Sequence, residues 1–179
     1  YRDRRQRQMC IRDSKKGEIV GVTGLDGNGQ DDFVKILAGV QEANGGTIEV
    51  LDINENFTKY NSLDDAKKNG ISFVSGDRKK EGILPNLSIY ENLVVPLYKK
   101  TSRGGFLGFV DWLELNGIFD WEVDRLSIKT GPRDNLIGSL SGGNQQKVMI
   151  ARSFAQHPKI LILNDPARGI DVSTKRDLY

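Results

Sequence analysis

The residues best suited to chemistry in this chain begin at Ser141, which two glycines follow, Gly142 and Gly143. Serine is a preferred N-cap, because its hydroxyl accepts a hydrogen bond from an N–H group in the first helical turn. A helix is predicted after it, since apolar residues recur in two adjoining stripes: Val148, Ala151 and Ala155 in one, Ile150 and Phe154 in the other. A helix start with small residues presents free N–H groups and a partial positive charge. Taken alone, the pattern fits both an ordinary capped turn and an anion site, for which phosphate is the expected anion.

A second candidate site lies earlier, where Gly24, Gly27 and Gly29 follow a short apolar stretch. That stretch, residues 18–23, is rich in β-branched residues and is predicted to be a buried parallel strand. After the glycines, apolar residues at helical spacing predict a helix: Phe33, Ile36, Leu37 and Val40. A strand, a glycine loop and a helix in this order are the context of a phosphate-binding P-loop, whose backbone N–H groups surround an anion. A tight turn without a ligand is the alternative, which the glycine spacing disfavours.

The loop departs from the P-loop consensus at the positions that normally hold the phosphates and the metal. Gln30 stands where a lysine contacts the outer phosphates, and Asp31, followed by Asp32, stands where a serine or threonine binds Mg²⁺. Glutamine keeps its hydrogen bonds but has no charge, and two carboxylates beside a triphosphate add repulsion that Mg²⁺ on Asp31 would partly offset. We expect such a loop to hold a nucleotide weakly, or to hold it without hydrolysing it.

The stretch of residues 140–147, read with the apolar run that leads into Asn164, Asp165 and Pro166, resembles the signature motif of ATP-binding cassette (ABC) ATPases. Its form is typical of the tandem ATPases of bacterial sugar importers of the ribose, galactose and xylose type. Because the second cassette of that group typically carries a degenerate P-loop, the resemblance places this chain as the C-terminal cassette. It implies an α/β fold of the P-loop NTPase type, with a mostly parallel sheet, an antiparallel β edge and a helical subdomain at about residues 83–139.

In ABC ATPases two cassettes enclose two ATP molecules, and each site joins the P-loop of one cassette to the signature motif of the other. The resemblance therefore implies that the partner's ATP contacts the signature residues Ser141, Gly142, Gly143, Asn144 and Gln145. The chain's own nucleotide would lie against Gly24, Leu25, Asp26, Gly27, Asn28, Gly29, Gln30, Asp31 and Asp32. ATP and Mg²⁺ are the implied cofactors, with the metal near Asp31 and Asn164.

Residues 159–163, predicted as a third buried strand, resemble the Walker B strand. Asn164 stands where an aspartate usually supports Mg²⁺, which removes a charge from the surroundings of the metal. Asp165 stands where a glutamate usually polarises the attacking water, and its shorter side chain is expected to impair it as a catalytic base. Asp171 lies in the loop that packs across the cassette dimer.

Two strands and one helix complete the predicted core. A turn at residues 44–46 leads into a strand over 47–51, which we expect to join residues 17–23 at the antiparallel edge. Ser62 is expected to cap a short helix over 62–68, and residues 71–74 are predicted to form another buried strand.

The next segment, residues 75–82, resembles the Ser-Glu-Asp-Arg-Lys element of second sugar-importer cassettes, with Gly76 in place of the acid. Most ABC ATPases instead end the preceding strand at a glutamine that touches Mg²⁺. The basic cluster of Arg78, Lys79 and Lys80 fits that element and an ordinary solvated loop equally well.

The predicted helical subdomain begins with a capping box at Ser88 and Glu91, and its first helix is expected to end near Pro96. Asp111 and Glu114 suggest a second box, before a run of apolar and aromatic residues. In the family, a groove beside this subdomain receives a short helix of the permease. The aromatic residues either line that groove or pack inside the subdomain.

The composition is that of a soluble globular protein, with 26 basic and 24 acidic residues and a net charge of +2, so bulk charge gives no reason to expect nucleic acid. No apolar run is long enough to cross a membrane. Residues 1–14 hold five arginines and two aspartates, and residues 9–14 resemble a translated transposon end used to attach sequencing adapters. We interpret residues 1–14, which include the single cysteine Cys10, as a non-native scar, and residues 15–179 as a partial cassette.

The resemblance implies ATP-driven import of a sugar or similar small solute, by a peripheral ATPase on the cytoplasmic face of the bacterial inner membrane. Its partners would be the N-terminal cassette, transmembrane permease subunits and, indirectly, an external solute-binding protein. Two alternatives stay open: a structural or regulatory cassette that does not hydrolyse ATP, and a soluble ABC protein without a transport role. The switch histidine and the adenine-stacking aromatic residue of the family are expected outside residues 15–179. The only histidine, His157, precedes the Walker B strand, so its position is not that of the switch histidine.

Overall fold

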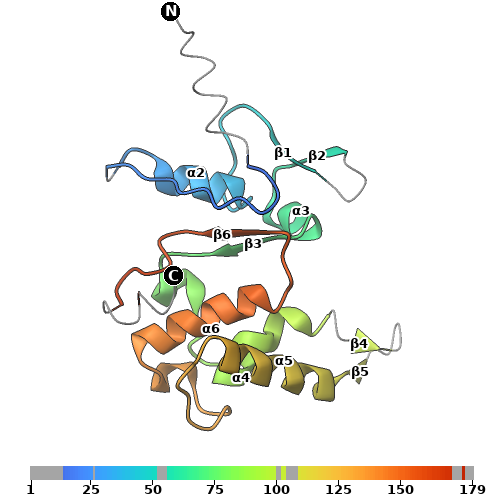
Figure 1. Cartoon of the computed structure of the whole chain (residues 1–179), viewed down its shortest axis with the longest axis vertical. Helices are drawn as coiled ribbons and strands as arrows, with labels where there is room; N and C mark the ends of the chain where they lie inside the picture. The colour runs from blue at the N-terminus through green and yellow to red at the C-terminus, as the bar shows by residue number, and fades with distance from the viewer. Residues whose placement is uncertain are drawn as a thin grey trace, which may run out of the picture.

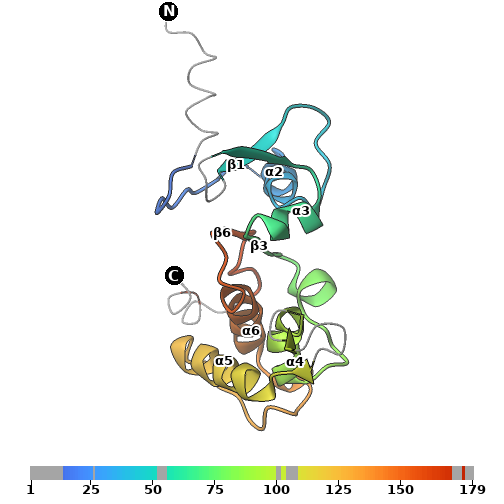
Figure 2. The ribbon, with the colours of Figure 1, turned by 90° about the vertical axis from the view of Figure 1, so that its right-hand side faces the viewer.

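The computed structural model describes residues 14–25, 27–51, 56–99, 102–103, 109–170 and 175. They form three layers, seen in Figure 1 and again after a quarter turn in Figure 2: α2 with an antiparallel strand pair, a parallel strand pair, and a helical layer. In chain order the elements are α2 (Gln30–Leu37), β1 (Ile48–Leu51), β2 (Phe57–Tyr60), α3 (Leu63–Lys68), β3 (Ile71–Val74), the π-helical turn η1 (Arg78–Gly82), α4 (Ile89–Val94), the 3₁₀ turn η2 (Val95–Leu97), β4 (Ser102–Arg103), β5 (Phe109–Val110), α5 (Trp112–Arg125), the 3₁₀ turn η4 (Ile137–Ser139), α6 (Gly142–Phe154) and β6 (Ile160–Leu163).

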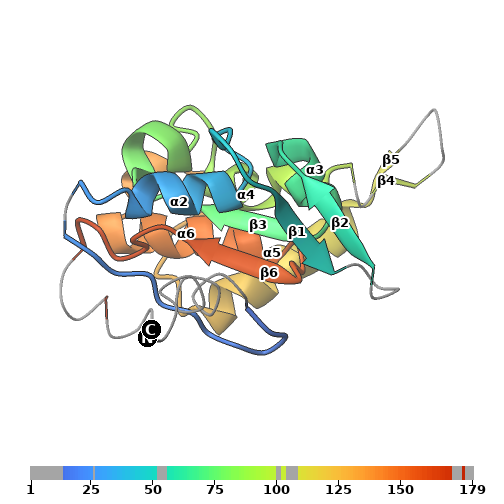
Figure 3. The ribbon, with the colours of Figure 1, turned by 90° about the horizontal axis from the view of Figure 1, so that it is seen from above.

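The middle layer is the parallel pair of β3 and β6, in which Ile71 faces Ile160 and Val74 faces Leu163. Parallel strands need a long crossover, and here the whole helical layer supplies it. α6 packs against one face of β3, and Figure 3 shows α2 lying over the other face of the pair. The predicted α/β fold with a parallel sheet is therefore present, and helices cover both faces of that sheet.

α6 belongs to two cores, because its two predicted stripes face different layers. Val148, Ala151 and Ala155 are buried in the apolar cluster that α6 shares with α4 and α5. The adjoining stripe packs on the sheet side, in a cluster that includes Ile150, Phe154 and Val74 of β3. The predicted helix is confirmed. Because both cores are closely packed, a movement of its first turn would displace side chains in both layers.

The helix starts of the helical layer are capped as predicted. Ser88 Oγ accepts the Glu91 N–H at 3.1 Å and Glu91 Oε2 accepts the Ser88 N–H at 2.8 Å, which completes a capping box. Asp111 Oδ1 accepts the Glu114 N–H at 3.0 Å at the start of α5. α4 passes into η2, which contains Pro96, so the first helix ends where expected.

The strand predicted over residues 18–23 does not form. These residues are irregular, and Ile19 has 98% of its surface exposed. An apolar stretch becomes a strand only where a neighbour pairs its N–H and C=O groups, and none of the strands in the described ranges pairs with it. The strand predicted over 47–51 does form, as β1, but it pairs antiparallel with β2, with Ile48 facing Tyr60, and not with residues 17–23.

The burial of the two parallel strands differs from the prediction at β6. β3 is almost entirely buried, as expected, because α3 and α6 pack against it. β6 is a strand, but Ile160 and Leu163 at its ends are exposed. Both strands have one paired neighbour among the described residues, but α3 and α6 pack against β3, whereas no helix of the described residues packs as closely on β6. α3 is present as predicted, with the Ser62 hydroxyl accepting the Asp65 N–H at 3.3 Å.

Some expectations concern residues outside the described part of the chain, namely the segment 1–13 with Cys10, Asp26 in the glycine loop, and Asp171. In the described ranges, no helix combines the length and apolar character that a membrane crossing requires.

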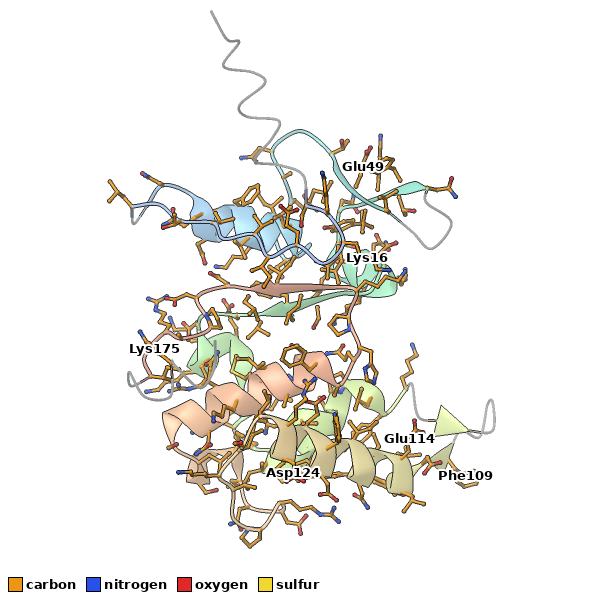
Figure 4. The ribbon with its side chains drawn as sticks, in the orientation of Figure 1. Lys16, Glu49, Phe109, Glu114, Asp124 and Lys175 are labelled. Atoms are coloured by element: carbon orange, nitrogen blue, oxygen red, sulfur yellow. The ribbon has the colours of Figure 1, made fainter. Side chains whose placement is uncertain are left out.

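The aromatic residues of the helical layer divide between its core and its surface. Phe119 of α5 is buried and packs against Tyr90, with ring centroids 5.2 Å apart. Trp121 of the same helix is exposed, and Figure 4 shows Phe109, also exposed, at the outer end of this layer. Packing inside the helical layer therefore accounts for some of these residues and not for others.

Candidate functional site

The glycine loop, described at residues 24–25 and 27–29, leads directly into α2. The Asn28 N–H donates to the Leu25 carbonyl at 3.1 Å, and the Phe33 N–H donates to the Gly29 carbonyl at 2.9 Å as the helix begins. Gly27 and Gly29 both have a φ of +85°, a conformation that side chains disfavour, so the turn requires glycine there. The loop and the helix of the predicted P-loop are present, whereas the strand that should precede them is not.

The side chain of Gln30 forms its hydrogen bond within the glycine loop. Its Nε2 donates to the Leu25 carbonyl at 3.0 Å, and its Oε1 is buried, with no hydrogen-bond partner among the described residues. That oxygen lies 3.4 Å from the position that a Cβ on Gly24 would take, so the amide folds back across the loop. The residue at the phosphate-binding lysine position therefore offers no charge, and one of its donors is already taken.

Asp31 has a protein partner on each carboxylate oxygen. Lys35 Nζ lies 2.8 Å from Oδ2, one helical turn along α2, and Asn164 Nδ2 donates to Oδ1 at 2.5 Å from the end of β6. Asp32, the next residue, is exposed. The structure thus brings together the two predicted metal residues, Asp31 and Asn164, although they are 133 positions apart in the chain.

The electrostatics of this group follow from those contacts. The hydrogen bond from Lys35 and that from Asn164 hold the pKa of Asp31 below its ordinary value. In return, the hydrogen bond to Asp31 raises the pKa of Lys35. Both shifts favour the ionised forms, so the pair is charged at neutral pH and carries no net charge.

Mg²⁺ does not fit these residues as they are arranged. The ion prefers six oxygen ligands at about 2.0–2.1 Å in near-ideal octahedral geometry. Here Asp31 is the candidate ligand, yet one of its oxygens holds an ammonium group and the other an amide N–H. No group of three or more histidine, cysteine or acidic residues in the described ranges is arranged to hold a metal ion.

Asp165, the predicted catalytic base, is exposed at a strained point of the backbone. Its φ is +40°, and its carbonyl accepts the Arg168 N–H at 3.1 Å in the turn after β6. Just before it, the backbone of Asn164 packs so closely on Gly76 that a Cβ there would lie 2.8 Å from the Asn164 oxygen. Gly76 therefore permits this close approach. The sequence pattern identifies Gly76 only as a replacement for the acid of the family element and does not predict this packing role.

The signature residues form the expected helix start. Ser141 Oγ accepts the Asn144 N–H at 3.4 Å and also the Asn144 side-chain amide at 3.1 Å. Asn144 Oδ1 in turn accepts the Lys129 N–H at 3.0 Å, and Gln145 Nε2 donates to the Leu140 carbonyl at 2.9 Å. Ser141 is exposed, so its hydroxyl is accessible while the turn around it is fixed.

Arg78 joins the 75–82 segment to this helix start. Its Nη1 donates to the carbonyl of Gly142 at 3.0 Å, and its Nε is buried without a partner in the described residues. Lys79 and Lys80 are exposed, so the basic cluster divides into one structural residue and two solvated ones. Sequence reasoning missed this contact because nothing local marks a bond between residues 64 positions apart.

The two groups of site residues lie on opposite sides of the parallel strand pair. Figures 1 and 2 show α2, with the glycine loop at its start, on one side and α6, with the signature residues at its start, on the other. Gly143 is buried in the first turn of α6, and Leu25 is exposed in the loop. The glycine-loop residues and the signature residues are therefore two separate groups, and Asp26 and Asp171 lie outside the described residues.

The sequence of this chain matches a known family over most of its length. The family described as "ABC transporter" matches residues 12–168. Two ribose import ATP-binding proteins, RbsA, from two strains of Bacillus cereus are 40% and 39% identical over 166 residues. The alignments cover 92% of this chain but only 32% of each relative, so the chain spans about a third of their length.

Solved structures are similar as well. The ATP-binding cassette MJ0796 in a dimeric, post-hydrolysis state bound to ADP and Pi aligns with a TM-score of 0.72 and 26% identity. A second dimeric structure of MJ0796, described as a bacterial ABC transporter cassette, aligns with a TM-score of 0.74 and 25% identity. Each alignment covers 92% of this chain and 67% of the solved chain.

Proposed function

Because the chain belongs to the ABC transporter family, we propose that it is part of the ATP-binding component of an importer for a sugar or similar small solute. The ribose import proteins among its relatives support this substrate class. The chain would act as the second cassette of a tandem pair. Its signature residues would complete the ATP site of the other cassette, while its own P-loop would be the weaker site.

The observation that carries this proposal is the contrast between the two half-sites. At the signature, Ser141 is exposed on a firmly capped helix start, where N–H groups and the helix dipole favour a phosphate. At the glycine loop, Gln30 is bonded to the loop itself, and Asp31 is paired with Lys35. The signature half-site is open toward an anion, whereas Gln30 and Asp31 at the glycine-loop half-site already have protein partners.

The expected partners follow from the same proposal. A signature that serves another chain's ATP needs a second cassette, and the dimeric structures of the related cassette support such an arrangement. Transmembrane permease subunits, and indirectly an external solute-binding protein, would complete the importer. The complex would then lie at the cytoplasmic face of the membrane, with this chain peripheral to it.

The test compares one variant in each half-site, in the full-length protein that contains both cassettes. Ser141→Arg should abolish ATP turnover, because a bulky cation would occupy the phosphate position, whereas Gln30→Ala should barely change it. Ser62→Arg is the matched control, since it removes a serine cap of the same kind from α3, away from both half-sites. Equal losses of turnover in the Ser141 and Gln30 variants would refute the division of roles.

A second candidate function is a cassette that holds nucleotide without hydrolysing it. The Asp31–Lys35 ion pair favours it, because the pair fills the position where hydrolysis would need a metal ligand. The two candidates differ in one measurement, the ATPase rate of a full-length protein whose other cassette has lost its P-loop lysine. Residual hydrolysis above background would exclude the purely structural role.

A further inference from the structure

The group formed by Asp31, Lys35 and Asn164 differs from an ordinary ion pair on a helix surface. A comparable pair exists on α3, where Lys68 Nζ lies 3.1 Å from Asp65. The side chain of Lys68 is 75% exposed, while that of Lys35 is only 26% exposed. The ammonium group of Lys35 is therefore held on a partly buried stem against its carboxylate.

The contact with Asn164 fixes the carboxylate from the opposite direction. Asn164 follows β6, on a different segment from α2, and donates to the oxygen that Lys35 does not use. The order of the helical pair is the favourable one, with the acid one turn before the base. Each oxygen of Asp31 thus already has one protein partner, so a cation that binds there has to share the carboxylate with Lys35 or displace it.

The position of this group is the one where the P-loop consensus has its metal ligand. A divalent cation bound to Asp31 would stand beside the Lys35 ammonium, which lies 2.8 Å from the same carboxylate. Like charges at such a separation repel, although the exposure of Asp31 to solvent weakens this repulsion. Asn164 directs its amide N–H, and not its amide oxygen, at this carboxylate.

The Lys35 ammonium offers the kind of charge that a metal would bring. An ammonium group has three N–H donors, and Asp31 accepts from one of them. Gln30 has no charge and donates into its own loop, so Lys35 is the cation that the structure places nearest the consensus metal ligand.

From these contacts we propose that Lys35 takes the place of Mg²⁺ at this cassette's own P-loop, so that nucleotide phosphate is held there without a divalent metal. The proposal rests on the proposed function, because it assumes that this P-loop is a nucleotide half-site. It makes Lys35 a positioning residue and a fixed counter-charge for phosphate, a role that the sequence did not suggest.

The test uses the full-length tandem protein in which the P-loop lysine of the other cassette is replaced, so that binding reports this half-site. Affinity for a fluorescent ATP analogue, mant-ATP, is measured with saturating Mg²⁺ and again with EDTA. We expect the two dissociation constants to agree within about twofold. In the Lys35→Met variant, Asp31 loses its cation, and affinity should come to depend on Mg²⁺ by about tenfold or more.

A second readout does not depend on nucleotide affinity. Mn²⁺ is titrated into the same proteins as a spectroscopic stand-in for Mg²⁺, and bound ion is followed by electron paramagnetic resonance. The protein with Lys35 should show no Mn²⁺ at this half-site, and Lys35→Met should gain one bound ion. Lys35→Gln provides a second variant with the same loss of charge, in case the methionine variant is poorly folded.

Lys68→Met is the matched control, because it breaks a helical aspartate–lysine pair away from the loop and should change neither readout. Mn²⁺ binding in the presence of Lys35, or none in either Lys35 variant, would overturn the proposal. Absence of mant-ATP binding under both conditions would overturn its nucleotide half. These failures leave the Ser141 comparison untouched, so they are distinguishable from a failure of the proposed function.

Discussion

Arg78 ties the loop after β3 to the start of the signature helix. Its guanidinium donates to the Gly142 carbonyl, at a helix start where the first backbone N–H groups have no partner within the helix. The same segment is held at its other end by Arg152 of α6, which donates to the Gly82 carbonyl. A displacement of the 75–82 segment would therefore be transmitted to the residues at the start of α6, which we propose contact the partner's phosphate.

We predict that Arg78→Gln lowers ATP turnover of the full-length protein by about tenfold, because one partly buried, charged hydrogen bond orders the signature turn. The loss should fall on kcat more than on KM, since the turn is displaced but the other cassette's P-loop still binds ATP. Arg78→Lys, which retains one donor, should recover part of the activity. Lys79→Gln, at an exposed neighbour, should behave like the unmodified protein. Equal effects of the substitutions at positions 78 and 79 would show that the Gly142 contact is unimportant.

The Asp31–Lys35 pair predicts how stability depends on pH. The folded pKa of Asp31 is lowered, so its contribution is present above the unfolded pKa and is lost as pH falls through the folded one. The folded pKa of Lys35 is raised, so its contribution is present below the unfolded pKa and is lost as pH rises through the folded one. The ion pair therefore contributes fully to the stability of the folded state between pH 3.8 and pH 10.5, and its contribution declines outside that range. The effect is small because Asp31 is exposed.

Urea unfolding of the unmodified chain and of Lys35→Met, followed across this range, measures that contribution. The difference in unfolding free energy between the two should be constant near neutral pH and shrink at both extremes. A difference that grows at acidic pH would contradict the assignment.

At the scale of elements, Asn92 of α4 holds the loop that connects the 75–82 segment to the helical layer. Its Oδ1 accepts the Leu84 N–H at 2.8 Å, and its Nδ2 donates to the carbonyls of Leu84, Leu87 and Ser88. Asn92 is 1% exposed, so its side-chain amide is shielded from water and is satisfied by these backbone groups. One side chain thus replaces the secondary structure that the loop lacks.

We predict that Asn92→Ala destabilises the full chain by about 2–4 kcal/mol, because it removes a buried side chain with four hydrogen bonds and leaves the Leu84 N–H without its partner. Denaturant titration measures the change. Asn86→Ala, at an exposed position of the same loop, is the control and should cost little. A loss at position 92 no larger than that at position 86 would refute this role.

The elements that sequence patterns predicted are those whose cause is local. The caps at Ser88, Asp111 and Ser141 depend on residues three apart, and the two stripes of α6 depend on spacing within one helix. Pairing between distant segments could not be read in this way. β1 pairs with β2 and not with residues 17–23. An apolar stretch can have the composition of a strand and still not form one when no neighbouring strand pairs with it.

The site divides along the same line. The types and spacing of Gly27, Gly29 and Ser141 predicted a loop and a helix start, and both are present. The contacts of Asp31 with Asn164 and of Arg78 with Gly142 join residues 133 and 64 positions apart, so no local pattern predicts them. Those long-range contacts are what distinguish a satisfied half-site from an open one.

At the scale of the whole molecule, the sheet separates the glycine loop from the signature residues. α6 and its capped start belong to the helical layer, whereas α2 and its loop lie across the parallel pair (Figure 3). A single copy therefore cannot close its own signature over its own P-loop without rebuilding the layers. This geometry supports a second cassette as the source of the missing half of each site.

The most direct test of this division locates the nucleotide during turnover. The full-length protein is photolabelled with 8-azido-ATP, digested, and the labelled peptides are identified by mass spectrometry. We predict label on the P-loop peptide of the other cassette, lost in Ser141→Arg and retained in Gln30→Ala. Label found mainly on the peptide that contains residues 24–32 of this chain, and unaffected by Ser141→Arg, would contradict the proposed roles of the two half-sites.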